Sequence, residues 1–328
     1  MWVVYLPVSF YYIFLSVKAR SLFFFSASNP SIETGGMFFE SKWSIFQLMP
    51  KAYYPNTILI EREEGIDTIR KKMQTAALHF PLIAKPDRGE RGWCVKKIIS
   101  EEELIGYRSR NKITFLLQEY IDQPVELSIF YFRKPGLERG TVTSVTYKKL
   151  LSVTGDGYST VEKLIQKNDR AFLQMERLKK EGFIDLDQVL EKGEEKLLVP
   201  YGTHVLGTMF INYNHMIDDA LIDVIDEISK QIPDFYFGRF DLRCSSIDDL
   251  KKGKNIYILE LNGAGAEPAH IYDPSFSFIQ AQFVLADHYR MMYEAAMENK
   301  KKTVSFMTFK DFRKNKKLEK EYKQSVVL

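Results

Sequence analysis

Two apolar segments near the C-terminal end carry polar side chains at every second position, and this pattern limits the fold more than any other feature. Alternate residues of a β-strand point to one face, so both segments are predicted strands with a charged face. If the strands pair, three oxygen-bearing side chains and two guanidinium groups meet there. Asp, Glu and Asn oxygens suit Mg2+, which completes its octahedron with waters and phosphate oxygens. The segments are 238–243, with Arg239, Asp241 and Arg243, and 259–265, with Glu260 and Asn262.

An ion-paired sheet face is the alternative interpretation of these two segments. Burying charges of both signs is costly because each ion loses its hydration. A glycine-rich loop, residues 263–265, also follows the second segment directly. We therefore predict a magnesium site at Asp241, Glu260 and Asn262, where manganese could substitute.

A lysine ends an earlier apolar strand. Lys85 closes the predicted strand 80–85 and is followed by the polar loop 86–92, which contains two glycines. An ammonium group and flexible backbone N–H groups at such a turn can hold an anion. The loop is not a Walker A motif, which needs Gly-Lys-Ser/Thr leading into a helix. A surface hairpin with incidental charges is the alternative.

The apolar strand 115–119 runs into a linker, which is a further candidate for ligand binding. Backbone groups from Gln118 to Ile121 can read the edge of an adenine, and the Glu126 carboxylate can accept hydrogen bonds from ribose hydroxyls. The same residues also suit an ordinary strand end and turn.

Strand and helix signals are mixed along the chain, and several neighbouring strands have the pattern of antiparallel partners. We therefore predict an α+β fold rather than a doubly wound parallel sheet. Strands are predicted at 57–60, 80–85, 93–99, 115–119, 126–132, 141–149, 196–199, 208–212, 235–243 and 255–262, and helices at 65–77, 101–110, 160–180, 218–232 and 277–299.

Composition excludes several classes of protein. Hydrophobic residues make up 45% of the 328 residues and charged residues 27%, which is typical of a soluble globular protein. The net charge of +3 comes largely from a lysine-rich tail, so we predict no nucleic-acid partner. Cys94 and Cys244 both lie in predicted strands, so we expect no disulfide framework and a reducing, cytoplasmic location.

The first residues are unusually apolar. Residues 2–16 carry no charge, contain Pro7 and are followed by Lys18 and Arg20. The run is too short to span a bilayer, and a secretory signal would place positive charge before it. We predict a helix that packs on the main domain, and the alternative is peripheral contact of residues 1–25 with the inner face of a membrane.

Taken in order along the chain, these motifs resemble the ATP-grasp superfamily, whose best-known group is the D-alanine:D-alanine ligases. The resemblance covers about residues 57–300. It implies an ATP-grasp fold, in which two α+β subdomains grip ATP, at residues 56–300. An apolar helical extension at 1–55 would precede this domain, and a basic tail at 301–328 would follow it.

The resemblance also implies roles for individual residues. Lys85 would contact the ATP phosphates, and Lys148 of a Tyr-Lys pair would do the same, with Lys149 as its rival. Arg239, two positions before the first metal-binding Asp, would neutralise phosphate charge during catalysis. The remaining positions are Glu119, Tyr120 and Ile121 for adenine, Glu126 for ribose, and Asp241, Glu260 and Asn262 for the metal.

Residues 153–165 add a second resemblance. Their Gly-Asp-Gly turn and following helix are similar to the ATP-grasp part of cyanophycin synthetases and bifunctional glutathione synthetases, which form amide bonds. An ordinary turn is the alternative.

The chain departs from the family pattern in two places. Relatives carry a Rossmann-like domain before the ATP-grasp core, whereas only about 50 to 80 apolar-rich residues precede it here. The loop 263–274 also differs, so the substrate residues are less well defined. Our candidates are Arg243, Gly263, Gly265 and His270, with a structural role as the alternative for His270.

We therefore expect a ligase that uses ATP and magnesium to activate a carboxylate as an acyl phosphate and joins it to an amine. Both substrates would be small molecules, such as amino acids or peptides. Two alternatives stay open, namely an ATP-dependent phosphoryl-transfer enzyme without ligation and a nucleotide-binding sensor. The sequence does not identify the carboxylate, the amine or the oligomeric state.

Overall fold

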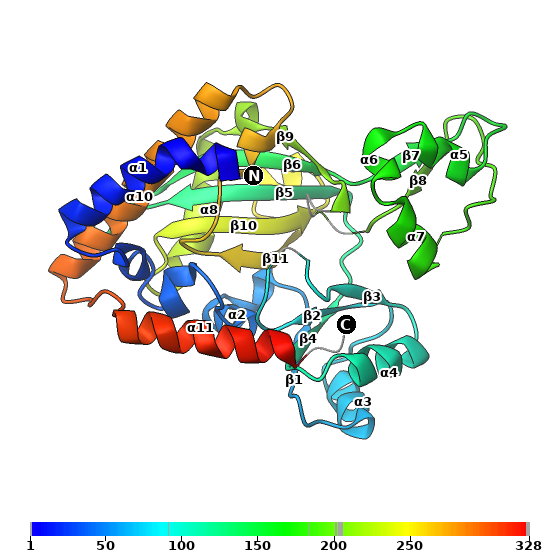
Figure 1. Cartoon of the computed structure of the whole chain (residues 1–328), viewed down its shortest axis with the longest axis horizontal. Helices are drawn as coiled ribbons and strands as arrows, with labels where there is room; N and C mark the ends of the chain where they lie inside the picture. The colour runs from blue at the N-terminus through cyan, green and yellow to red at the C-terminus, as the bar shows by residue number, and fades with distance from the viewer. Residues whose placement is uncertain (1, 91, 183, 201, 203–205, 326–328) are drawn as a thin grey trace. The chain divides into compact units, whose positions relative to one another are not determined.

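The computed structural model describes residues 2–90, 92–182, 184–200, 202 and 206–325. The chain forms two compact units: the first contains residues 1–146 and 212–328, and the second contains residues 147–211. Both units combine helices with antiparallel strands (Figure 1), so the predicted α+β class is confirmed.

A four-stranded antiparallel sheet in the first unit has the order β1-β4-β2-β3. Ile69 and Met73 of α3 and Leu104 and Tyr107 of α4 pack against this sheet. Helix α4 begins after Ser100, whose hydroxyl accepts a hydrogen bond from the backbone N–H of Glu103, and such a cap satisfies an otherwise unpaired helix donor. The elements are β1 (Thr57–Ile60), α3 (Ile66–Thr75), β2 (Leu82–Pro86), β3 (Lys96–Ile98), α4 (Glu101–Arg110) and β4 (Phe115–Glu119).

A five-stranded sheet with the order β11-β10-β5-β6-β9 forms the rest of the strand structure of the first unit. Strand β10 pairs antiparallel with both β5 and β11, while β6 leads into the second unit and β9 leads back. The elements are β5 (Val125–Phe132), β6 (Thr141–Lys149), β9 (Met209–Asn212), η5 (Asn214–Met216), α8 (Asp219–Lys230), β10 (Phe237–Cys244), α9 (Ile247–Lys251), β11 (Ile256–Asn262), η6 (Ala269–Tyr272) and α10 (Phe278–Lys301).

The two faces of β10 differ in chemistry, and this difference positions the candidate site. On the odd-numbered face, Phe237 and Phe130 of β5 pack into a core with Met292 and Ala296 of α10. Further along the same face come Arg239, Asp241 and Arg243. Helix α10 therefore covers the apolar end of this face, and the charged end forms the candidate site.

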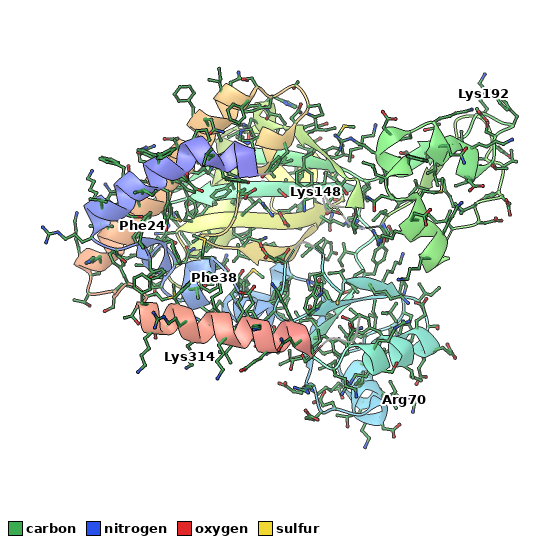
Figure 2. The ribbon with its side chains drawn as sticks, viewed as in Figure 1. Phe24, Phe38, Arg70, Lys148, Lys192 and Lys314 are labelled. Carbon is green, nitrogen blue, oxygen red and sulfur yellow. The ribbon has the colours of Figure 1, made fainter. Side chains whose placement is uncertain are left out.

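The N-terminal segment packs against α10 and the C-terminal helix. The ring of Phe24, which is labelled in Figure 2, has its centroid 5.1 Å from that of Tyr12 and 5.7 Å from that of Tyr293. The basic C-terminal segment forms a helix whose Phe312 contacts Phe23 and Phe38. These elements are α1 (Trp2–Ala19), η1 (Phe24–Ala27), η2 (Glu33–Gly36), α2 (Lys42–Leu48), η3 (Lys51–Tyr53) and α11 (Phe309–Gln324). None of the helices in the described ranges is long and apolar enough to cross a membrane.

The second unit contains β7 (Ser152–Thr154), β8 (Glu195–Leu197), α5 (Val161–Gln166), α6 (Asp169–Phe172) and α7 (Met175–Glu181). The prediction of one helix over residues 160–180 is wrong, because the segment forms three short helices. The side chain of Asn168 accepts hydrogen bonds from the backbone N–H groups of Arg170 and Ala171. This cap starts a new helix and ends the previous one.

One strand assignment also needs correction. Cys94 has a φ of +54° and lies in a turn before β3, which begins at Lys96 rather than at residue 93. Cys244 is the last residue of β10, and both cysteines are free thiols.

Candidate active site

Strands β10 and β11 pair as predicted. Asp241 lies directly opposite Glu260, and Arg239 lies directly opposite Asn262. The register shifts after this point, because Leu242 opposes Ile258 and leaves Leu259 as an extra residue in β11. This β-bulge interrupts the ladder beside the charged side chains, and pairing resumes at Leu242 and Ile258. The pairing therefore brings the three predicted metal ligands and Arg239 together on one sheet face.

The Asp241 carboxylate accepts hydrogen bonds from several side chains of this face. Arg239 binds it through two parallel hydrogen bonds, of 2.9 Å from Nε and 3.0 Å from Nη2, and Ser128 Oγ donates to Oδ1 at 2.6 Å. The Nδ2 atom of Asn262 lies 3.5 Å from Oδ2. Such a forked ion pair is strong and directional. It fixes both side chains at the centre of the face.

The donor set is suitable for magnesium. In the described part of the chain, no group of three or more His, Cys, Asp and Glu side chains is placed to hold a metal ion. Asp241 and Glu260 supply two carboxylates, and Asn262 adds an amide oxygen. Mg2+ is commonly held by one or two carboxylates together with waters and substrate phosphates, so these residues fit the ion. A bound cation would share Asp241 with Arg239.

Lys85 reaches from the end of β2 to strand β11. Its Nζ donates to Gln118 Oε1 at 2.8 Å and to the Leu259 carbonyl at 2.9 Å, and it lies 5.0 Å from the Phe46 ring centroid. Burial lowers the pKa of this lysine to about 7, although the nearby Glu260 carboxylate opposes the shift. Lys85 is therefore held beside the charged face, with an ammonium group that titrates near neutral pH.

Lys42 was not predicted from the sequence, yet its Nζ lies 3.4 Å from Glu260 Oε1. It also donates to the backbone carbonyl of Gly89 in the loop after Lys85. The Lys42 side chain is 15% exposed and that of Glu260 is 35% exposed, so the lysine is the more buried partner of the ion pair. This lysine adds a third cation to the face, beside Arg239 and Lys85.

The start of α2 is fastened to the loop that carries Asp87. Ser41 Oγ accepts a hydrogen bond from Ser44 N and donates to Asp87 Oδ1 at 2.9 Å. The same carboxylate oxygen accepts from Trp43 N at 2.9 Å, and Lys42 N donates to the Asp87 carbonyl at 2.9 Å. These bonds set the position of Lys42.

Glu40 is a second residue of the N-terminal segment near this face. Its Oε2 is buried, and no hydrogen-bond partner is present among the described residues. Burial raises the pKa of Glu40, Lys42 opposes that effect, and the Glu260 charge adds to it. Two signals in the sequence could have drawn attention to this segment: the paired glycines 35 and 36, and a serine at a helix start.

The predicted substrate residues Gly263 and Gly265 contact the backbone of the N-terminal segment. Ala264 N donates to Gly35 O at 2.9 Å, and Gly265 N donates to Gly36 O at 2.8 Å. A Cβ atom on Gly263 would lie 2.4 Å from the Gly35 oxygen, so only glycine permits this approach. Substrate contact by these two glycines stays a prediction.

The predicted adenine and ribose residues lie at the other end of the face. Arg243 forms a buried ion pair with Glu126, at 2.9 Å from Nε to Oε2, and donates to the Ile121 carbonyl at 2.7 Å. The Tyr120 ring lies beneath Lys97, whose Nζ is 3.7 Å from its centroid. Glu119 is exposed, and its carboxylate accepts from Asn56 N at 3.3 Å. The predicted ribose and substrate residues thus contact each other.

His270 is buried, and its Nδ1 lies 2.6 Å from Ser144 Oγ. Burial lowers its pKa to about 4, and the neighbouring His288 adds to the shift, so the ring is neutral at pH 7. This environment suits the structural role that we gave as the alternative, and substrate contact by His270 remains a prediction.

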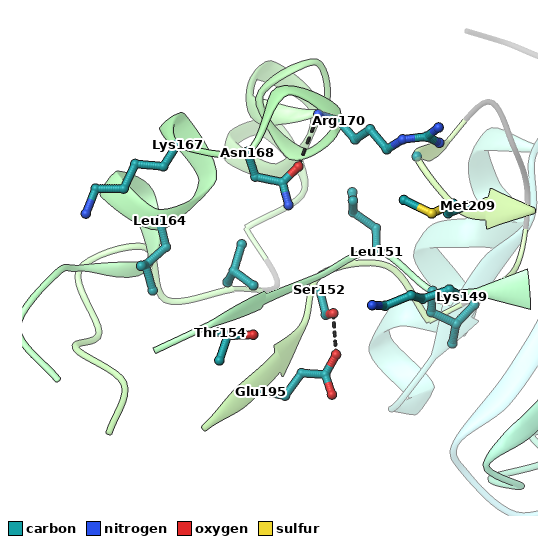
Figure 3. A pocket seen from close by; sticks show the side chains of 13 residues that line it. Lys149, Leu151, Ser152, Thr154, Leu164, Lys167, Asn168, Arg170, Glu195 and Met209 are labelled. Atoms are coloured by element: carbon teal, nitrogen blue, oxygen red, sulfur yellow. Dashed lines mark hydrogen bonds between the residues drawn. The ribbon is translucent and has the colours of Figure 1, made fainter. Parts of the chain in front are cut away.

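Lys148 and its rival Lys149 belong to the second unit, where Lys148 is buried and Lys149 is exposed. A cavity of about 370 Å3 lies within this unit (Figure 3). Lys149, the rival of Lys148 as a predicted phosphate contact, is the one predicted site residue among those that line the cavity. Figure 3 also shows Ser152 donating a hydrogen bond to Glu195, and Arg170 and Lys167 at the same cavity. None of the predicted site residues on β10 and β11 lines this cavity.

Comparisons with known proteins give structural similarity only. No protein-family model matches the chain, and no curated protein matches it. Among solved structures, a VanG D-Ala:D-Ser ligase from Enterococcus faecalis is 15% identical, with a TM-score of 0.44, over 78% of this chain and 62% of that chain. A D-alanine–D-alanine ligase from Bacillus anthracis is 14% identical, with a TM-score of 0.45, over 80% and 69%. A bifunctional glutathione synthetase from Pasteurella multocida is 14% identical, with a TM-score of 0.41, over 77% and 35%.

Proposed function

We propose that this protein is an ATP-grasp ligase that activates a carboxylate with ATP and joins it to an amine, with release of ADP and phosphate. The observation that carries the proposal is the β10–β11 register, which sets Asp241 opposite Glu260 and Arg239 opposite Asn262. Lys85 and Lys42 reach the same strand from outside the sheet. Three cations around two carboxylates form a site that suits polyphosphate with a divalent metal.

The reaction divides into two displacements. An oxygen of the substrate carboxylate attacks the γ-phosphorus of ATP, the bond from that phosphorus to the β–γ bridging oxygen breaks, and ADP leaves. The amine nitrogen then attacks the acyl carbon of the acyl phosphate, phosphate leaves with the C–O bonding electrons, and the nitrogen loses a proton. Neither step needs a covalent bond to the protein, so alignment and charge neutralisation are the protein's contribution.

Each candidate residue has a defined part in this proposal. Arg239, Lys85 and Lys148 neutralise phosphate charge, and residues 118–121 hold adenine beside Glu126 for the ribose. Asp241, Glu260 and Asn262 would hold Mg2+, or Mn2+ in its place, and the ion would supply charge neutralisation at the transferred phosphoryl group. Loop 87–92 excludes water, which would hydrolyse an acyl phosphate.

Lys42 is a further candidate for phosphate binding. Its ammonium group lies between Glu260 and the Gly89 carbonyl, so it is placed to contact phosphate oxygens together with Lys85. We propose that residues 35–48, which supply Lys42, provide part of the site.

The deciding experiment measures ADP release from the purified protein with MgATP. A panel of amino acids and dipeptides is supplied as carboxylates, with and without a second amine. A ligase releases ADP and forms an amide only when both substrates are present. Release with a carboxylate or hydroxyl compound alone, accompanied by a stable phosphorylated product, would instead establish the phosphoryl-transfer alternative. Tight ATP binding without any release would support the sensor alternative.

We further propose that the enzyme works in the cytoplasm. The free thiols of Cys94 and Cys244 suit a reducing compartment, and ATP is available there.

A further inference from the structure

Helix α1 has one face packed against the first unit. Val8 lies in a cluster with Ala281 and Leu285 of α10, and Leu15 and Ala19 lie in a cluster with Met292 and Ala296. The Tyr12 hydroxyl donates to the Leu22 carbonyl at 2.7 Å. The helix is therefore fixed along α10 (Figure 1), as the sequence predicted.

The opposite face of α1 is apolar and uncovered. Its residues recur at spacings of three and four, so they lie along one side of the helix. Their exposed fractions range from 52% to 72%. Single exposed apolar residues are ordinary, but a continuous row of them marks an interaction site. We name this row the α1 stripe: Leu6, Phe10, Ile13, Phe14 and Val17.

The chemistry of the α1 stripe favours lipid over a protein partner. Protein interfaces combine apolar contacts with about one hydrogen bond per 100–200 Å2. The α1 stripe consists of hydrocarbon and phenyl groups alone, with no side-chain donor or acceptor to specify a protein surface. A lipid surface requires no directional partner. Ile279 and Phe283, at the start of the supporting helix α10, are also largely exposed.

The charges around the stripe are complementary to anionic headgroups. The first acidic residue of the whole sequence is Glu33, whereas Lys18 and Arg20 follow the stripe directly and are exposed. Asn299 at the end of α10 donates to the Ala27 carbonyl at 2.8 Å. Lys300, Lys301 and Lys302 follow Asn299 in the sequence, and Lys301 forms an ion pair with Glu298 at 3.0 Å. Lysine and arginine beside an apolar helix face are typical of helices that bind anionic membranes.

We propose that the α1 stripe lies in the headgroup region of an anionic lipid bilayer, with α1 parallel to the membrane surface. An 18-residue helix is about 27 Å long, enough to rest along a bilayer with its inner face still packed on α10. The basic groups at its end contact lipid phosphates. This inference is independent of the proposed ligase reaction.

The test uses the full chain and vesicles of phosphatidylcholine with or without phosphatidylglycerol, in a flotation assay. We expect the protein to float with the phosphatidylglycerol vesicles and binding to weaken as salt is raised. The double variant Phe10→Ser/Phe14→Ser should bind at least about tenfold more weakly, because it removes two phenyl groups from the stripe. The variant Lys18→Glu/Arg20→Glu should lose the preference for anionic vesicles.

A matched control removes two exposed leucines elsewhere, Leu137→Ser/Leu173→Ser, and should bind vesicles like the parent. Thermal unfolding checks that all variants fold, which is expected because every changed side chain is exposed. Equal binding by the parent and Phe10→Ser/Phe14→Ser would overturn the proposal, as would no vesicle binding at all. A parent dimer that this double variant converts to monomer in sedimentation would also overturn it, because the stripe would then be an interface between copies.

Discussion

Strand β10 carries two ion pairs on the same face, and their surroundings differ. Arg239 and Asp241 are 20% and 9% exposed, and Glu260, Asn262 and Lys42 lie next to them. Arg243 and Glu126 are 5% and 7% exposed, and the Ile121 carbonyl binds the remaining guanidinium nitrogen. The Arg239–Asp241 pair has charged neighbours with which it can exchange partners, and we call it the open pair. The Arg243–Glu126 pair is almost fully buried, and we call it the closed pair. Alternating charges on a strand therefore do not by themselves distinguish a reactive site from a structural contact.

The strongest test of the comparison is Glu260→Gln at the open pair. The substitution keeps the volume of the side chain and removes its charge, so the proposed metal loses an anionic ligand. We expect ADP formation to fall about 10³-fold, or about 4 kcal/mol of transition-state stabilisation, across a magnesium titration. Unfolding temperature should stay near that of the parent, because the side chain is 35% exposed. Parental turnover in a folded Glu260→Gln protein would show that this face is only a set of ion pairs.

Breaking the closed pair should lower the free energy of unfolding. Arg243→Ala leaves the Glu126 carboxylate buried without its partner, which typically costs about 3–5 kcal/mol. Urea unfolding should report that loss, whereas Arg239→Ala at the more open pair should cost less stability and more activity. Equal stability losses for the two variants would remove the distinction between the pairs.

The Lys42→Met variant tests whether the N-terminal segment contributes to the site around the open pair. We expect the KM for ATP to rise or kcat to fall by about 10- to 100-fold in total, since one charged contact to phosphate is lost. Lys42→Arg should recover part of the activity. Lys51→Met is the matched control, because Lys51 follows α2 in the same segment and contacts only the Tyr54 ring among the described residues. A loss of equal size in the control would assign the effect to the fold of the segment.

The smallest expected effect is the change in ATP affinity when Lys85 loses its proton. Its pKa of about 7 means that the ammonium form predominates at pH 6 and the neutral form at pH 8. If ATP binds the charged form, affinity should fall about tenfold between these two pH values. Stability should change in the opposite sense: from pH 7 to the ordinary lysine pKa, the unfolded chain binds more protons, so the free energy of unfolding rises with pH. Both dependences should be absent in Lys85→Met, as measured by calorimetry and urea unfolding.

Local patterns predicted the α+β class, most strand positions and the pairing of β10 with β11. They failed where the outcome depends on contacts between distant residues. Arg243 and Glu126 are 117 positions apart, so their ion pair could not be read from either motif. Lys42 reaches Glu260 from a segment that is held by hydrogen bonds to Asp87, including the one from Ser41. The predicted helix at 160–180 failed for a local reason, since Asn168 offers the backbone an alternative set of hydrogen bonds.

The bulge at Leu259 has a consequence for insertions and deletions. Ile256, Ile258, Glu260 and Asn262 are all even-numbered, so a regular strand would aim them at one side of the sheet. The extra residue separates them, because Ile258 opposes Leu242 while Glu260 opposes Asp241. A regular strand that kept Leu259 would turn either two isoleucines toward water or a carboxylate and an amide into the apolar layer. Removing Leu259 would instead leave a regular strand with both sets on their present faces, but without the backbone carbonyl that accepts from Lys85. The extra residue is therefore tied to the contact with Lys85.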